Sequence, residues 1–366
     1  MGDPTYDTFM GHGPKRIVHW EHWSCPDAET FLTGIDYYEH PRLCRQRLQE
    51  LYPQLGLPVP ADDTPKVRPT IGTPNESAAG TGDDRPRARW GDGESSSWDF
   101  GKAYTTPEQV FASSPLQLAA ERRIGGAPFN DVSSEEAIYT EAMARFAPGL
   151  EGQPAPKDSA VTAWFYNTLF MWPLLTYGWE LFLETCLDPE FDRIMDEFAE
   201  ISRRVFRALA RVPVNFVTCH DDIATTRGPV CSPAWMRRHI FPRYEEYWSM
   251  LKDSGKHAIF MVDGCVDAYV PDVMACGARG IISEPVTDYK AIARRYDNPF
   301  LAGEGDNRIL CRNNPAEIEA MVRSMAETGR MSGGYMMCIG NHIPWNVPGE
   351  AAKLYLDLSA ELAYRG

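Results

Sequence analysis

The spacing of hydrophobic and polar positions divides the chain near residue 160. From about Val161 onward, short apolar runs alternate with segments of helical spacing, which is typical of a parallel sheet covered by helices. Before that point the pattern is irregular, and residues 53–100 are so rich in Pro, Gly, Asp and Ser that they predict a loop-rich insertion. We find no internal repeat with a period of roughly 20–50 residues. Residues 1–366 are therefore expected to form a single domain with an irregular N-terminal region.

Five predicted strand–helix units follow one another in the second half of the chain. The strands are predicted at residues 215–219, 257–262, 280–283, 299–303 and 334–338. The helices after them are predicted from Pro233 to about Lys252, up to about Cys276–Gly277, from Lys290 to Tyr296, from Pro315 to about Thr328, and from Gly349 to the C-terminus. This pattern is compatible with a barrel or with an open doubly wound sheet. Because no GxGxxG motif follows a strand, we expect a (β/α)8 TIM barrel of the α/β class.

Two local signals support the helix boundaries. Ser232 precedes Pro233 and is a plausible N-cap, because proline is favoured at the first helical position. Gly277 suits the left-handed conformation that ends many helices.

Composition excludes several classes of protein. The hydrophobic share of 43% and the charged share of 24% are those of a globular chain. A formal net charge of -15 would repel a phosphate backbone, so we do not expect nucleic acid as a partner. The N-terminal residues lack the pattern of a secretory signal, and no apolar run approaches the ~20 residues that span a bilayer. Because the nine cysteines form no CxxC pair, we expect reduced thiols and a cytoplasmic protein without membrane contact.

Each of the five strands is followed at once by polar residues that a plain turn does not require. In chain order these are His220, Asp221 and Asp222; Asp263 and Cys265; Glu284; Glu304, Asp306 and Arg308; and Cys338, Asn341 and His342. In a barrel the carboxyl ends of the strands meet at one face, so these side chains are expected to form a site. Such a site could bind a divalent metal, polarise a carboxylate-bearing substrate or transfer protons. His257 begins a strand and is therefore expected at the opposite face.

Structural roles compete with each of these assignments. Asp222 or Asp263 could cap the segment that follows, and His220 or His342 could be a hydrogen-bonded structural histidine. Zinc would be held by Asp263, Cys338 and His342, with Glu284 as a further candidate ligand. No CxxC or HExxH spacing supports that set.

Aromatic residues are concentrated in two segments. One is His19-Trp20-Glu21-His22-Trp23, and the other contains Trp164, Phe165, Tyr166, Phe170, Trp172, Tyr177 and Trp179. They could wall an apolar pocket or surround a methylammonium group, and they could equally belong to the core.

Four segments resemble the uroporphyrinogen decarboxylase superfamily. They are HDDIATTRGPVCSPAWMRRHIFPRY, MVDGCVDAYVPDVMACGARGI, LAGEGDNRIL and GGYMMCIGNHIPWNVP. The resemblance implies a (β/α)8 barrel with its active site at the carboxyl-terminal face. The RQAGR motif with which the tetrapyrrole decarboxylases bind propionates is absent, so uroporphyrinogen decarboxylation is not expected. The branch that the chain resembles better contains corrinoid-dependent methyltransferases.

This resemblance also implies candidate ligands. Some of these methyltransferases have a His-x-Cys pair where this chain has Met261-Val262-Asp263, so only Asp263 remains as a ligand there. Their late-strand cysteine aligns near Asn341, and Cys338 lies three residues earlier. The candidate metal ligands remain Asp263, Glu284, Cys338 and His342.

The resemblance leads us to expect a methyltransferase that passes a methyl group from a small O- or N-methylated compound to the cobalt of a separate corrinoid protein. Asp263, Glu284 and His342, with or without zinc, would stabilise the leaving atom, and Asp222 would donate or orient a proton. His220 is a further candidate catalytic residue. The candidate substrate-binding residues are Trp164, Tyr166, Trp172, Arg227, Asp306 and Asn341.

Two other functions stay open. A decarboxylase or lyase would hold a carboxylate with Arg227 or Arg308 and protonate a carbanion with Asp222. A non-catalytic barrel would bind cobalamin or a tetrapyrrole. Because the chain has no DxHxxG motif, a corrinoid would come on another protein. The methyl donor, the final acceptor and the oligomeric state, including a homodimer, are not determined by the sequence.

Overall fold

The described residues form two compact units. The computed structural model describes residues 3–68 and 103–365. Unit 1 contains residues 3–9 and 103–282, and unit 2 contains residues 10–68 and 283–365. Within the predicted loop-rich insertion, residues 56–68 form neither helix nor strand, and residues 69–100 lie outside the described residues. The single domain over residues 1–366 stays a prediction.

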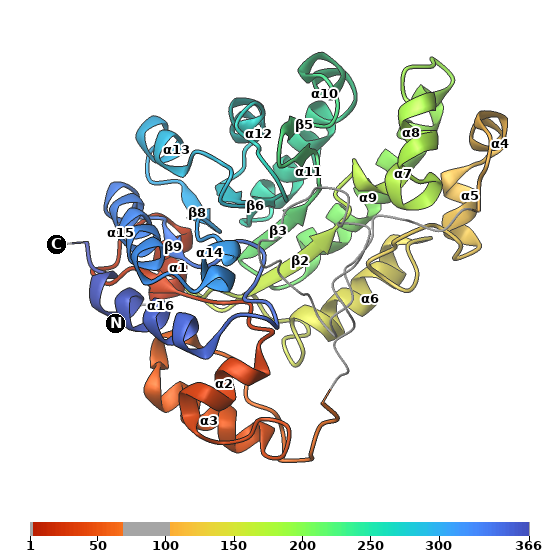
Figure 1. Ribbon diagram of the computed structural model, residues 1–366. Helices are drawn as coiled ribbons and strands as arrows, with labels where there is room; N and C mark the ends of the chain where they lie inside the picture. The colour runs from red at the N-terminus through yellow and green to blue at the C-terminus, as the bar shows by residue number, and fades with distance from the viewer. Residues whose placement is uncertain (1–2, 69–102, 366) are drawn as a thin grey trace. The chain divides into compact units, whose positions relative to one another are not determined.

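Unit 1 contains a sheet of parallel strands. In spatial order these are β2 (Thr162–Tyr166), β3 (Phe216–His220), β6 (His257–Met261) and β7 (Gly280–Ile282). Figure 1 labels the first three of them. Every residue of β3 is buried, as expected where helices cover a parallel sheet. The register places Tyr166, His220 and Met261 side by side at the carboxyl end. The residues that follow these three positions therefore leave the sheet at the same edge, close to one another.

Two amphipathic helices pack along this sheet. The 21-residue helix α9 (Phe191–Arg211) contacts α11 (Phe241–Asp253), and α11 also contacts β6. Phe206 of α9 stacks on Tyr247 of α11 with ring centroids 4.8 Å apart. Aromatic side chains thus form much of the interface between these two helices.

The predicted helix from Pro233 to Lys252 is wrong in one respect, because the structure has two helices there. Helix α10 (Pro233–His239) ends before Ile240, and α11 begins at Phe241. Pro242 has no backbone N–H and its ring clashes with the preceding turn, so it favours a break at this point. The predicted cap at Ser232 is confirmed, since its hydroxyl accepts a hydrogen bond from the Trp235 amide at 3.2 Å.

The other elements of unit 1 are short. The helices are α1 (Pro4–Phe9), α4 (Pro107–Ala112), α5 (Pro115–Ala120), α6 (Glu135–Phe146), α7 (Met171–Tyr177), α8 (Trp179–Thr185) and α12 (Val270–Ala275). Strands β4 (Ala224–Thr225) and β5 (Gly228–Pro229) form a small antiparallel hairpin. The N-terminal part is thus more helical than the irregular pattern predicted, because its helices are short and several begin at prolines. No helix of the described ranges has the length and apolar character needed to cross a bilayer.

Unit 2 also contains parallel strands. Strand β1 (Val18–His19) pairs with β9 (Met336–Met337), and an isolated parallel bridge between Leu301 and Tyr335 joins β8 (Phe300–Ala302) to the β9 segment. The helices are α2 (Pro26–Thr33), α3 (Pro41–Leu51), the 3-10 helix η1 (Pro53–Leu55), α13 (Tyr289–Arg295), α14 (Asn307–Arg312), α15 (Pro315–Met331) and α16 (Gly349–Leu362). Helix α14 was not predicted, because its six residues follow a polar segment.

A buried carboxylate connects three elements of unit 1. Asp221, which follows β3, is fully buried and accepts hydrogen bonds from the backbone amides of Leu169, Phe170 and Met171 at 2.5, 2.7 and 2.9 Å. The Tyr244 hydroxyl of α11 donates a fourth bond at 2.7 Å. Burial raises the pKa of Asp221 to about 6, although these hydrogen bonds oppose the shift. Asp221 therefore fixes the end of β3 to the start of α7 and to α11.

We expect Asp221→Asn to lower the free energy of unfolding by roughly 2–4 kcal/mol, because the new amide group would face donors that need an acceptor. Tyr244→Phe, which removes one donor, should cost only about 1 kcal/mol. Urea denaturation followed by circular dichroism measures both. A loss below about 0.5 kcal/mol for Asp221→Asn would show that the carboxylate is not structurally important.

Candidate functional site

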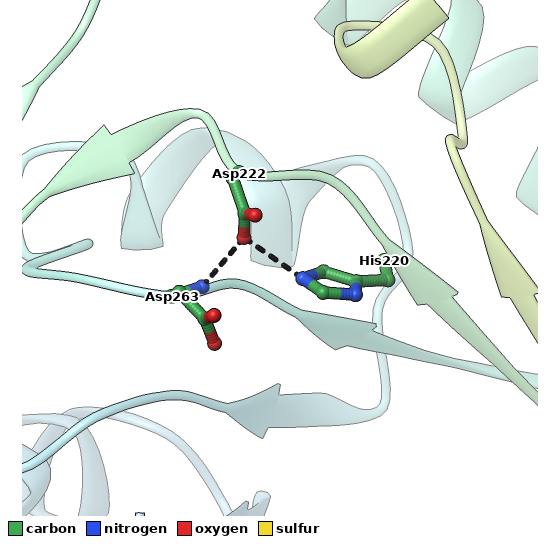
Figure 2. A group of neighbouring side chains, drawn as sticks. All are labelled: His220, Asp222 and Asp263. Atoms are coloured by element: carbon green, nitrogen blue, oxygen red, sulfur yellow. Dashed lines mark hydrogen bonds and ion pairs between the residues drawn. The ribbon is translucent and has the colours of Figure 1, made fainter. Parts of the chain in front are cut away.

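Three predicted residues of unit 1 lie together at the carboxyl ends of β3 and β6. His220 Nε2 lies 2.8 Å from Asp222 Oδ1, and the backbone amide of Asp263 donates to the same oxygen at 2.9 Å (Figure 2). One ligand atom from each of the three side chains lies within 4.8 Å of the others. Asp222 and Asp263 are therefore part of a polar cluster, and Asp222 does not cap a helix.

The cluster combines burial with negative charge. His220 and Asp222 are each 4% exposed. Burial alone lowers the pKa of His220, but the hydrogen bond to Asp222 and the nearby charges of Asp222, Asp263 and Asp221 outweigh it and raise the pKa. The second ring nitrogen, Nδ1, is buried and has no hydrogen-bond partner among the described residues. The site can therefore retain a proton or accept a cation.

Tyr166, a predicted substrate-binding residue, lies beside this cluster. Its ring packs edge-on against His220 with centroids 4.4 Å apart, and the residue is 48% exposed. Partial burial and the charges of Asp263 and Asp222 raise its pKa, so the hydroxyl stays protonated near neutral pH. Tyr166 thus presents an aromatic surface and a hydrogen-bond donor next to two carboxylates.

The other predicted substrate-binding residues of unit 1 lie in different environments. Trp164 is half-buried on β2, and Arg227 is exposed in the turn between β4 and β5. Trp172 is fully buried, and its indole donates to the Ser202 hydroxyl at 2.9 Å. The assignment of Trp172 to a substrate pocket is therefore corrected, because its ring and its only donor both belong to the core of unit 1.

The predicted zinc ligands are divided between the two units. Asp263 lies in unit 1, whereas Glu284, Cys338 and His342 lie in unit 2. Cys338 is 4% exposed, and burial together with the charge of Glu21 raises the pKa of its thiol well above the ordinary value. Among the described residues, the group of three that could hold a metal is His220, Asp222 and Asp263. Of the four predicted ligands, this group contains only Asp263, and the predicted zinc set stays a prediction.

Three other candidates of unit 2 form hydrogen bonds with residues near them in sequence. Asp306 accepts a hydrogen bond from the Arg308 amide at 2.9 Å and caps α14. The Arg308 guanidinium also contacts the Asp306 carboxylate at 2.9 Å. Both residues are thus engaged with each other. Asn341 has a φ of 64° and accepts a hydrogen bond from its neighbour His342 at 2.8 Å.

His220 was predicted as a catalytic residue, but it was not named among the residues that could hold a metal ion. The signal was present, because His220 and Asp222 are two residues apart at a strand end, where alternate residues lie on the same side. The role of Asp221 left no such signal, since its partners lie 23 to 52 residues away.

Comparison with known proteins identifies the family. Residues 182–362, about half of the chain, match the family profile described as "Uroporphyrinogen decarboxylase (URO-D)". The predicted resemblance to the uroporphyrinogen decarboxylase superfamily is confirmed. A solved structure titled "methyltransferase from Methanosarcina mazei" has a similar fold, with a TM-score of 0.55 and 15% sequence identity over 98% of this chain and 97% of that chain. No match was found among curated proteins.

The predicted α/β fold class is confirmed, because parallel strands alternate with helices, and the family match and the similar methyltransferase fold agree with the expected TIM-barrel type. The matched segment of residues 182–362 includes the strand ends that carry His220, Asp222 and Asp263. The polar cluster is therefore part of the uroporphyrinogen decarboxylase-like segment.

Glu304, which follows β8 in unit 2, has a raised pKa that can be tested by mutation. Its carboxylate accepts a hydrogen bond from the Thr328 hydroxyl at 3.0 Å, and burial raises its pKa above the ordinary 4.5. The folded protein therefore retains this proton at a pH where the unfolded chain has lost it, and stability falls as the pH rises through the folded pKa. We therefore expect the change in the free energy of unfolding caused by Glu304→Gln, relative to the wild type, to be more favourable at pH 8 than at pH 4.

The measurement is urea denaturation of the wild type and Glu304→Gln at both pH values. Glu151→Gln, at an exposed position, serves as the matched control. If the difference between wild type and Glu304→Gln is the same at pH 4 and pH 8, the carboxyl of Glu304 does not have a raised pKa.

Proposed function

We propose that the chain is a methyltransferase that transfers a methyl group from a small O- or N-methylated compound to the cobalt of a separate corrinoid protein. The observation that carries this proposal is the buried pair of His220 and Asp222, joined to Asp263, at the ends of β3 and β6. The similarity in fold to a methyltransferase supports it.

The reaction requires the bond between the methyl carbon and an oxygen or nitrogen to break as a carbon–cobalt bond forms. The reduced cobalt supplies the electron pair for the new bond, and the leaving atom keeps the pair of the broken bond. The barrier is lowered when a proton or a positive charge stabilises that leaving atom. His220 is suited to this role, because the neighbouring carboxylates raise its pKa and so favour its protonated form.

The surrounding residues would orient the substrate. Asp222 holds the His220 ring through Nε2, and the Asp263 amide in turn fixes the Asp222 carboxylate. Tyr166 offers an exposed aromatic surface against which a methylated group can pack. Together these contacts restrict the positions in which a donor can bind next to the imidazole.

The cluster also fits zinc. Imidazole nitrogen and carboxylate oxygen are suitable ligands, His220 Nε2 lies 2.8 Å from Asp222 Oδ1, and one ligand atom from each of the three residues lies within 4.8 Å of the others. We propose that His220, Asp222 and Asp263 would hold the ion. When bound, zinc would act as a Lewis acid on the leaving oxygen or nitrogen.

The activity is tested by incubating the protein with free cob(I)alamin and a panel of methyl ethers and methylamines, and following methylcobalamin by absorbance. We expect turnover with at least one donor, and a loss of roughly 10²-fold or more in kcat for Asp222→Asn, the range for a lost acid–base group. Asp253→Asn, an exposed position on α11, should behave like the wild type.

Other outcomes would replace the proposal. Release of carbon dioxide from a carboxylated compound without cobalamin would indicate the decarboxylase or lyase. Binding of cobalamin without turnover, unchanged in Asp222→Asn, would indicate the non-catalytic binder.

Zinc is tested separately by elemental analysis of purified protein. We expect His220→Ala and Asp263→Ala each to lower the zinc content by one ion per chain and Cys338→Ala to leave it unchanged, because only the first two variants remove proposed ligands of this cluster. Loss in Cys338→Ala with retention in His220→Ala would favour the ligand set expected from the resemblance. Well-folded protein without metal would favour proton transfer by His220 and Asp222 alone.

A further inference from the structure

A second group of potential ligands lies in unit 2, and it is independent of the proposed function. His22 follows β1, and His342 follows β9, its parallel neighbour. Beyond these strands the pairing continues, because Trp23 and Ile343 form a parallel bridge. The Ile343 amide donates to the His22 carbonyl at 2.9 Å. The two histidines are therefore neighbours on a hydrogen-bonded backbone.

The imidazole rings are close enough to share one metal ion. Their centroids are 4.9 Å apart, and their planes are inclined by 46°. With a metal–nitrogen bond of about 2.1 Å, two imidazoles on one tetrahedral or square-planar ion have centroids roughly 4.5–5.2 Å apart. The observed separation lies within that range.

Asn341 sets the tautomer of His342. The Nδ1 atom lies 2.8 Å from the Asn341 Oδ1, and an amide oxygen can only accept a hydrogen bond. The proton is therefore on Nδ1, and the lone pair is on Nε2. A hydrogen bond from the distal nitrogen to an oxygen is the usual way in which proteins orient a metal-binding histidine. The left-handed backbone of Asn341, with φ of 64°, makes this contact possible.

The surroundings favour nitrogen ligands over oxygen ligands. The nearest carboxylate in sequence, Glu21, is 1% exposed and contacts His19 at 2.8 Å, the Ile339 amide at 3.1 Å and the Tyr355 hydroxyl. It is thus engaged in a buried network. His22 is exposed, so an ion can reach it from solvent. Imidazole ligands select borderline transition metals over magnesium or calcium.

We propose that His22 and His342 bind one divalent transition-metal ion, such as zinc, nickel or copper, as a two-histidine chelate. Nε2 of His342 and a ring nitrogen of His22 are the protein ligands. Water or an incoming nitrogen- or sulfur-containing ligand completes the coordination. This site is distinct in its residues from the group of His220, Asp222 and Asp263.

The experiment uses the full chain carrying His220→Ala, which removes the imidazole of the other candidate site. Zinc is titrated by calorimetry, and one equivalent of copper is examined by electron paramagnetic resonance. We expect one ion per chain and coupling of copper to two nitrogens. His22→Ala and His342→Ala should each weaken zinc binding about 10- to 100-fold or more, since each leaves a single imidazole.

Two further variants test the positioning by Asn341. Asn341→Gly permits the same backbone but removes the acceptor, so it should weaken binding about 10- to 100-fold, whereas Asn341→Asp should retain it. His40→Ala, an exposed histidine at the start of α3, is the matched control and should have no effect.

The proposal is overturned if zinc affinity is unchanged in both His22→Ala and His342→Ala, or if copper couples to fewer than two nitrogens. Circular dichroism of each variant shows whether it is folded. Because the readout is metal binding, failure of the methyl-transfer assay does not affect this test.

Discussion

The buried carboxylate of Asp221 is the interaction on which the geometry of unit 1 depends. Three backbone amides at the start of α7 and the hydroxyl of Tyr244 converge on it. The same loop is held a second time, because the Thr168 amide and hydroxyl both donate to the His220 carbonyl. The end of β3 is therefore fixed at His220 and at Asp221. These bonds restrict the movement of the cluster of His220, Asp222 and Asp263.

The order His220-Asp221-Asp222 has a simple physical explanation. Successive residues of an extended chain point to opposite sides, so the first and third share one side and the second takes the other. His220 and Asp222 contact each other, whereas Asp221 is bonded to α7 and α11. One carboxylate supports the structure and its neighbour contributes to the candidate site, although the two are chemically identical.

The parts of the fold that could be predicted are those governed by local pattern. Alternating apolar runs indicated the parallel strands, and the polar residues after them indicated His220, Asp222 and Asp263. The break before α11 was visible in Pro242 but was overlooked, because the helical spacing continues across it. The bonds of Asp221 and the burial of Trp172 depend on residues distant in sequence, so no local pattern revealed them. The predicted zinc set was drawn from polar residues that follow the predicted strands, and of its four members only Asp263 belongs to the cluster with His220 and Asp222.

The two histidine clusters show how surroundings change the chemistry of one side chain. The hydrogen bond to Asp222 and the neighbouring carboxylates outweigh burial and raise the pKa of His220, whereas burial, with a smaller effect of His22, lowers the pKa of His342 to about 3. The charges that retain a proton on His220 also attract a cation, so a proton and a metal ion compete for that cluster. The proposals for the two clusters follow from this difference: the first can hold either a proton or a metal ion, whereas the pair of His22 and His342 has no carboxylate ligand and is proposed to bind a metal through nitrogen alone.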